Sequence, residues 1–250
     1  MAEGATHVGI CAKTRQCAFT LAEVLITLAI IGVVAAMTIP TLINNYQEKV
    51  TVTKVKKAFN TLTNAYRLAQ IDHGSIDQWG IDPNVNTFTG ESASIVANKI
   101  KPYLRVIDDC GTSTCDGYIE VITYLSGFKH NKDDAISNAI DMSHNNIYKM
   151  RLADGVGVYI RSKDNAAELF LDINDGKEPN ILGKDIFHFA ITSTGVIGTG
   201  VGKDPSSTSF AACNPKKEGW YCTGWVVYKG NMDYLKCPDN LTWADNKCPN

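Results

Sequence analysis

FTLAEVLITLAIIGVVAAMTI, residues 19–39, is an unbroken apolar run in which Glu23 is the only charged residue. A helix of this length spans about 30 Å, which is the thickness of the hydrocarbon core of a bilayer. A secretory signal peptide has a shorter apolar core, about 7–15 residues, followed by a small-residue cleavage site. The polar residues after Pro40 offer no such site. The run therefore predicts a membrane-spanning helix.

Glu23 needs an explanation, because an ionisable side chain inside a membrane helix is costly and is by default a functional candidate. It lies only four positions into the apolar run. At that depth its carboxylate can reach the membrane interface, so periodicity alone leaves two readings open. Glu23 is either a tolerated interfacial charge or a functional group with a partner.

The junction at residues 18–23, AFTLAE, resembles the processing site of type IV prepilins and type II secretion pseudopilins. The resemblance implies that a prepilin peptidase cleaves after Ala18 and methylates the new amino terminus of Phe19. Glu23 would then be the fifth residue of the mature chain and an assembly residue, facing the ammonium group of its own or a neighbouring subunit. Pairing of the two buried charges lowers the desolvation penalty that either suffers alone.

Other positions agree with this resemblance or depart from it. Gly32 and Pro40 fall where the family often has Gly and Pro. Ala18 replaces the usual Gly, Cys17 replaces a basic residue, and Ala22 stands where a bulkier aliphatic residue is common. We expect these departures to slow processing without abolishing it.

The rest of the chain divides around the apolar run, and we expect an α+β, pilin-like fold. In this fold a long amino-terminal helix packs its second half against an antiparallel β-sheet head. The expected segments are a leader, a transmembrane helix segment, an amphipathic helix spine, an α+β head and a Cys- and Trp-rich tail of the head, at residues 1–18, 19–40, 41–72, 73–210 and 211–250.

The spine is predicted from an apolar stripe with alternating spacings of three and four, which is the pattern of one helix face. Its members are Val52, Val55, Phe59, Leu62, Tyr66 and Ala69. Two arrangements remain open at Pro40, which removes a helical hydrogen bond. The helix either continues through it or is broken there into two helices.

The sheet is predicted from a change to a period of two after Ile147. Tyr148 to Leu152 and Val156 to Arg161 flank Asp154-Gly155, a dipeptide that favours a hairpin turn. Residues 168–173 and 186–191 read as two further strands in an antiparallel meander. One face of these strands carries Leu169, Leu171, Ile173, Phe187, Phe189 and Ile191. His188 falls on the opposite face, where we expect an exposed or half-buried side chain.

Six cysteines remain after the leader, and an even number suits an oxidising compartment. They are Cys110, Cys115, Cys213, Cys222, Cys237 and Cys248. Cys110 and Cys115 are close enough for a local disulfide and lack the second pair that a zinc site needs. Nearest-neighbour pairing is the simplest arrangement for the other four, although bridges to Cys110 or Cys115 also remain open.

The loop at residues 172–185 raises the question of calcium. It carries Asp172, Asn174, Asp175, Glu178 and Asp185. An EF-hand needs Gly at its sixth position, whereas Gly176 is the fifth counted from Asp172. Turn-forming side chains that bond the backbone are the favoured reading. We therefore expect no metal and no cofactor.

The tail places six aromatic residues among four cysteines, which indicates either a small satellite core or an exposed ligand-binding patch. They are Trp220, Tyr221, Trp225, Tyr228, Tyr234 and Trp243. The sequence contains none of the motifs GxSxG, HExxH or GxxxxGK[ST], so an enzyme is not expected. A net charge of −2 gives no nucleic-acid footprint.

Together these features predict a structural subunit of a type II secretion pseudopilus or a type IV pilus-like filament. Its expected partners are prepilin peptidase, copies of itself or other pilin-like subunits, and inner-membrane assembly machinery. We expect a single-pass inner-membrane protein with its head in the periplasm, or a subunit of a periplasmic or surface filament. The alternative is a membrane-tethered binding module or adhesin that uses the aromatic tail.

Overall fold

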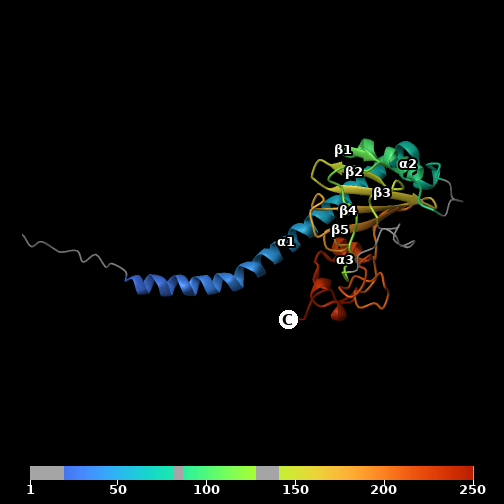
Figure 1. Cartoon of the computed structure of the whole chain (residues 1–250). Helices are drawn as coiled ribbons and strands as arrows, with labels where there is room; N and C mark the ends of the chain where they lie inside the picture. The colour runs from blue at the N-terminus through green and yellow to red at the C-terminus, as the bar shows by residue number, and fades with distance from the viewer. Residues whose placement is uncertain (1–19, 82–86, 128–140, 250) are drawn as a thin grey trace, which may run out of the picture. The chain divides into compact units, whose positions relative to one another are not determined.

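The computed structural model describes residues 20–81, 87–127 and 141–249 (Figure 1). The chain forms two compact units, Met1–Tyr46 and Gln47–Asn250. The first described element, α1 (Leu21–His73), begins in the first unit and ends in the second. It includes Pro40, so the alternative of two helices broken there is wrong. Pro40 removes one backbone hydrogen bond, yet the helix continues through it with Ile39 and Thr41 on either side.

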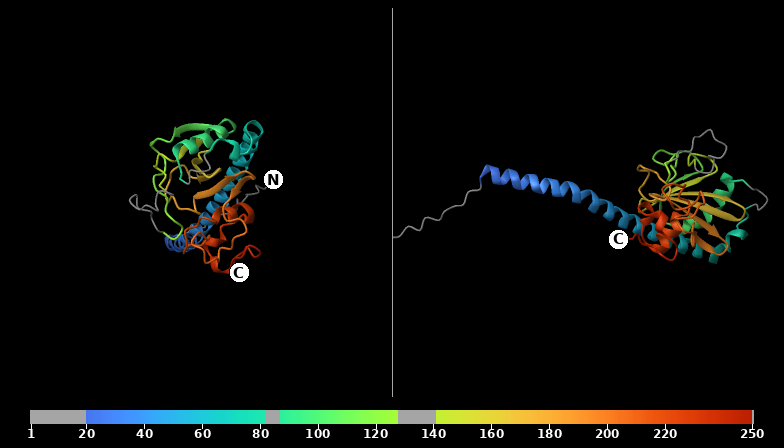
Figure 2. Two further views of the ribbon diagram at one scale, coloured as in Figure 1. Left: turned by 90° about the vertical axis from the view of Figure 1, so that its right-hand side faces the viewer. Right: turned by 90° about the horizontal axis from the view of Figure 1, so that it is seen from below.

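The second unit is a six-stranded antiparallel sheet with helices, which confirms the α+β fold (Figures 1 and 2). The strands pair in sequence order: β1 (Val106–Gly111), β2 (Tyr148–Leu152), β3 (Gly157–Lys163), β4 (Ala166–Asp172), β5 (Ile186–Thr192) and β6 (Gly195–Gly198). The predicted hairpin joins β2 to β3, with Gly155 at a φ of 80°. Short turns join β2 to β3, β3 to β4 and β5 to β6, whereas residues 112–147 separate β1 from β2 and residues 173–185 separate β4 from β5.

The shorter elements surround the sheet. The helices are α2 (Gly90–Ile100) and α3 (Cys222–Lys229), and the 3-10 turns are η1 (Ile76–Gln78), η2 (Lys101–Tyr103), η4 (Asp233–Leu235) and η5 (Pro238–Asn240). The hydroxyl of Thr89 accepts a hydrogen bond from the backbone N–H of Ser92 and so caps the start of α2.

The main core lies between the sheet and the second half of α1. The buried residues of α1 are Val52, Val55, Ala58, Leu62, Ala65, Tyr66 and Ala69. Five of the six predicted stripe positions are among them, and Phe59 is partly buried and stacks on Phe189 at 6.1 Å between ring centroids. The apolar face predicted for β4 and β5 lies in the same core, as does the buried side of α2.

The opposite face of the sheet is also covered, which sequence periodicity did not predict. Tyr159, Phe170 and Ile186 from the strands form a second cluster with residues of the connecting segments. Those residues are Ile119, Ile122, Tyr124, Met142, Ile147 and Leu182. The central strands are therefore buried on both faces.

Disulfides join the cysteines that are nearest in the sequence. The pairs are Cys110–Cys115, Cys213–Cys222 and Cys237–Cys248. Cys222 is the first residue of α3, and this helix lies against β5 and β6. Gly224 makes the approach possible, because a Cβ there would lie 2.5 Å from the backbone nitrogen of Val201.

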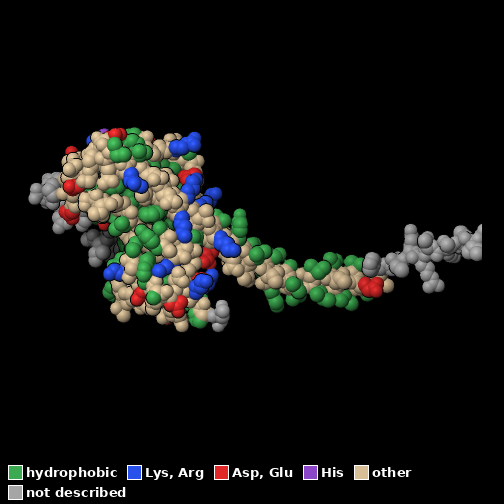
Figure 3. Space-filling model, turned by 180° about the vertical axis from the view of Figure 1, so that it is seen from behind, with side chains coloured by type: hydrophobic (Ala, Val, Ile, Leu, Met, Phe, Trp, Pro, Cys, Tyr) green, Lys and Arg blue, Asp and Glu red, His purple; other side chains and the backbone are tan. Residues whose placement is uncertain are grey.

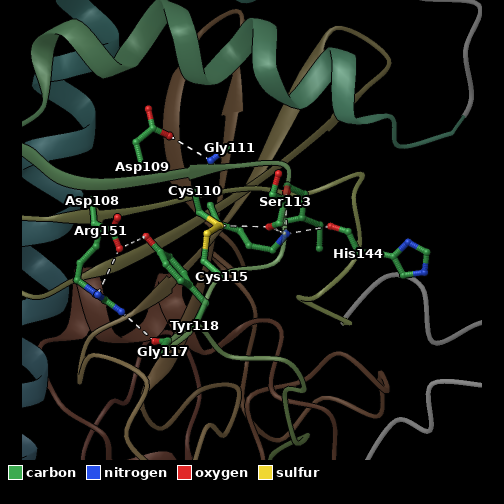
Figure 4. The surroundings of a disulfide bond; sticks show 12 residues. Asp108, Asp109, Cys110, Gly111, Ser113, Cys115, Gly117, Tyr118, His144 and Arg151 are labelled. Carbon is green, nitrogen blue, oxygen red and sulfur yellow. Dashed lines mark hydrogen bonds and ion pairs between the residues drawn. A yellow bond between two sulfur atoms is a disulfide. The ribbon is translucent and has the colours of Figure 1, made fainter.

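The Cys110–Cys115 disulfide closes a loop that contains Ser113 (Figure 4), and the buried side chain of Lys149 holds this loop. The Lys149 ammonium donates to the carbonyl of Ser113, inside the Cys110–Cys115 loop, and to that of His144, each at 3.1 Å. Burial lowers the pKa of Lys149 from its ordinary value. These carbonyl contacts satisfy a charge that would otherwise be costly to bury.

Candidate assembly site

The first half of α1 exposes apolar side chains along its length (Figure 3). Leu21 is 77% exposed and Met37 is 74% exposed. The helix is long and apolar enough to cross a membrane, and its most apolar stretch is not buried by any of the described residues. An apolar surface of this size needs lipid or other protein around it.

The hydroxyl groups of this stretch are satisfied within the helix. Thr27 Oγ1 donates to the carbonyl of Val24 at 2.9 Å, and Thr38 Oγ1 donates to that of Val34 at 2.9 Å. Such bonds reduce the cost of a hydroxyl in hydrocarbon. Glu23 is consequently the polar group of this stretch that most needs a partner.

Glu23 forms a capping box with Thr20 at the start of α1. The Glu23 Oε2 atom accepts hydrogen bonds from the backbone N–H and the hydroxyl of Thr20, both at 2.8 Å. In return, the Thr20 hydroxyl accepts from the backbone N–H of Glu23 at 3.2 Å. The sequence signal for this contact is the T-x-x-E spacing of residues 20–23, which the apolar pattern alone does not predict. The contact directs the carboxylate toward the helix start, where the chain joins Phe19.

Ala18 and Phe19, the predicted processing and methylation residues, lie outside the described residues. Their roles remain predictions from the sequence motif. The leader at residues 1–18 falls outside the described part of the chain in the same way.

The carboxylates of Asp172 and Asp185, in the acidic segment between β4 and β5, accept hydrogen bonds from backbone N–H groups of the same segment. Asp172 Oδ1 accepts from the N–H of Asn174 at 3.0 Å, and Asp185 Oδ2 accepts from the N–H of Asn180 at 2.8 Å. Burial raises the pKa of both carboxyl groups against the effect of these hydrogen bonds. Among the described residues, no group of three or more His, Cys, Asp or Glu side chains is arranged to hold a metal ion.

Four of the six aromatic residues of the tail fall into two sets. Trp225 and Tyr234 are fully buried in the main core, and the Tyr234 hydroxyl donates to the carbonyl of Gly183 at 2.6 Å. Trp220 and Tyr221 instead line a cleft. The tail therefore provides core packing and also part of an accessible surface.

Comparison with known protein families agrees with the amino-terminal site. Residues 13–39 match the prokaryotic N-terminal methylation motif, the signature of type IV prepilin-like proteins. By this motif the chain is a type IV pilin-like or pseudopilin-like precursor. Residues 41–197, more than half of the chain, match a family described as a family of unknown function (DUF6613), and the chain belongs to that family. No curated protein and no solved structure matches this chain.

Proposed function

We propose that the protein is a structural subunit of a type IV pilus-like or type II secretion pseudopilus-like filament. The observation that supports this most strongly is the methylation motif at residues 13–39, which covers most of the exposed apolar half of α1. Prepilin peptidase cleaves between Ala18 and Phe19 and methylates Phe19. The apolar helix segments of neighbouring subunits then pack together as they leave the membrane.

Glu23 is the assembly residue in this proposal. Its carboxylate lies at the start of α1 and is bonded to Thr20. After cleavage the ammonium group of Phe19 is only one residue from Thr20 in the sequence, and in a filament a neighbouring ammonium is also available. A carboxylate buried with such a cation is stable, whereas removal of one partner costs about 3–5 kcal/mol.

The head belongs outside the cytoplasm in this proposal. Three disulfides lie in the second unit, and disulfides persist in oxidising compartments. The precursor is accordingly a single-pass inner-membrane protein with a periplasmic head, and the mature protein enters a periplasmic or surface filament. Its partners are prepilin peptidase, inner-membrane assembly machinery, and copies of itself or other pilin-like subunits. Its role is structural, not enzymatic.

Mass spectrometry of the amino-terminal peptide tests the processing step. The mature protein should begin with N-methyl-Phe19 in cells that contain prepilin peptidase, and the intact precursor should accumulate in a strain that lacks this enzyme. An intact leader in both strains, or cleavage beyond Pro40, would rule out the proposal. A membrane-tethered binding module, the alternative function, would need neither methylation nor Glu23.

A further inference from the structure

Lys and Arg side chains gather where α1 enters the second unit (Figure 3). Four lysines lie within residues 49–57, and the next acidic residue of α1 after Glu48 is Asp72. Two basic residues, Lys13 and Arg15, precede the apolar run. Membrane proteins carry their excess of Lys and Arg on the cytoplasmic flank of a span. Here the excess lies on the flank of the disulfide-bonded head, so membrane topology does not account for it.

Two of these four lysines are already bound within the head. Lys57 forms an ion pair at 2.8 Å with a carboxylate of the β2–β3 turn, and Lys54 Nζ donates to the carbonyl of Ile173 at 2.8 Å. In the described part of the chain, no carboxylate forms an ion pair with Lys49 or Lys56. These two lysines keep their charge for a partner outside the head.

Lys49 and Lys56 lie on the same side of α1 and next to the end of α3. They are seven residues apart, which is two turns or about 10 Å. A Cβ at Gly230, which follows α3, would lie 2.8 Å from Lys56 Nζ. The preceding residue, Lys229, holds its ammonium 4.3 Å from the ring centroid of Trp243. We call Lys49, Lys56 and Lys229 the basic patch.

The carboxylates beside the basic patch are engaged by another lysine. Lys236 Nζ lies 2.7 Å from Glu48 Oε2 and 3.6 Å from Asp233 Oδ1. Glu48 Oε1 also accepts from the backbone N–H of Met232 at 2.9 Å. With Lys236 included, four lysines face two carboxylates, so this region is positive although the whole chain has a net charge of −2.

The basic patch begins close to the level at which α1 leaves a membrane. Leu42, Ile43 and Tyr46 are exposed, and an exposed Tyr after an apolar stretch is usual at the membrane interface. Lys49 follows Ile43 by six residues, or about 9 Å along the helix, and the head-group layer is roughly 5–7 Å thick on each side of a bilayer. Helical side chains also lean toward the start of their helix. The ammonium of Lys49 therefore lies near the lipid phosphates when α1 spans the membrane.

We propose that the basic patch binds anionic phospholipid head groups of the membrane that holds α1. Lysine ammonium groups donate to phosphate oxygens, and each one near an anionic surface adds to the attraction. A zwitterionic head group brings its own cation, so the patch should prefer phosphatidylglycerol to phosphatidylcholine. The proposal rests on insertion of α1 and not on filament assembly, so it is independent of cleavage and methylation.

The test uses the full chain in nanodiscs that contain equal amounts of phosphatidylcholine and phosphatidylglycerol. Native mass spectrometry counts the lipids that remain on the protein after its release. We expect the wild type to retain an excess of phosphatidylglycerol that becomes smaller at high salt. Lys49→Gln should lower this preference about fivefold, and Lys49→Gln/Lys56→Gln should lower it further.

Arg67→Gln is the matched control and should keep the wild-type preference. Arg67 is exposed and follows Lys49 by eighteen residues, so it lies on the same side of α1 but about 27 Å farther along the helix. All variants share the leader, so a difference between them reports on the head.

Two results would contradict the proposal. The first is a wild type without preference for phosphatidylglycerol, including a wild type that binds a polyglutamate peptide in place of lipid, which would assign the basic patch to an acidic protein. The second is an equal preference in the Lys49→Gln and Arg67→Gln variants. Gln has a helix propensity close to that of Lys and Arg, so all these variants should keep the wild-type unfolding temperature.

Discussion

Glu168→Gln is the substitution in the head whose effect the structure predicts most directly. Burial opposes ionisation of this carboxyl group, but His188 and Arg161 beside it outweigh burial and lower its pKa to about 2. The substitution removes the negative charge and keeps the size of the side chain. It removes the carboxylate that forms an ion pair with the buried guanidinium of Arg161.

Breaking a buried ion pair from one side costs about 3–5 kcal/mol. A domain of 150–250 residues loses about 2–4 °C in unfolding temperature for each kcal/mol. At the lower end of this cost, Glu168→Gln should lower the unfolding temperature by about 6–12 °C. Glu178→Gln is the matched control, since Glu178 is exposed, and it should leave the unfolding temperature within about 1 °C of wild type.

Thermal unfolding of the full chain in nanodiscs, followed by near-ultraviolet circular dichroism, measures the effect. The double variant Arg161→Met/Glu168→Gln should be more stable than Glu168→Gln alone, because it also removes the buried guanidinium that has lost Glu168 as its ion-pair partner. The reasoning fails if Glu168→Gln unfolds within about 2 °C of wild type. It also fails if the decrease in unfolding temperature of the double variant equals the sum of the decreases for Glu168→Gln and Arg161→Met measured separately.

Three further predictions concern the head. The free energy of unfolding should decrease as the pH falls from about 4.5 to about 2, because the pKa of Glu168 is lower in the folded state than in the unfolded state. Burial also lowers the pKa of His188, so a first part of this loss should begin below about pH 6.5. Urea titrations at each pH would measure the two losses. Replacing Cys213 and Cys222 together by Ser should lower the free energy of unfolding, measured with urea, by about 2.5–3 kcal/mol. Alkylation of the unreduced wild-type protein should find no free thiol among its six paired cysteines. Gly224→Ala should lower the unfolding temperature by several degrees in the thermal unfolding assay, whereas an unchanged value would show that α3 can move away from Val201.

Sequence periodicity predicted the parts of the fold that bury one apolar face. The stripe on α1 and the alternating residues of β4 and β5 are confirmed because both elements contribute to a single core. Asp154-Gly155 was sufficient to place the β2–β3 turn, since the glycine takes a positive φ there.

The second core depended on long-range contacts that periodicity does not encode. His188 alternates with buried residues and was expected to be at least half exposed, yet it is 7% exposed because Trp220 packs on it from the tail. The strands β1 and β6 were also missed. β1 has two register irregularities and no buried residue, and β6 is only four residues long. The turn at Asp164-Asn165, where both residues take positive φ, was a local signal for the β3–β4 hairpin.

The candidate assembly site was predicted in its residues but not in its local contacts. Glu23 stood out because it is the only charge in an apolar run, whereas its bond to Thr20 follows from a capping pattern that is common in soluble helices. That contact matters for experiments, since removing Glu23 affects both a helix cap and any charge pairing.

The most direct test of the central claim measures filament yield for Glu23→Gln and Glu23→Val beside wild type, with membrane insertion and cleavage after Ala18 measured separately. Gln at this position can still form the capping box with Thr20 but carries no charge, so it separates the cap from the ion pair. If Glu23 pairs with an ammonium group during assembly, both variants should insert and be cleaved normally and should form few or no filaments. Wild-type filament yield from Glu23→Gln would contradict the pairing mechanism and would leave Glu23 as a helix cap at the membrane interface.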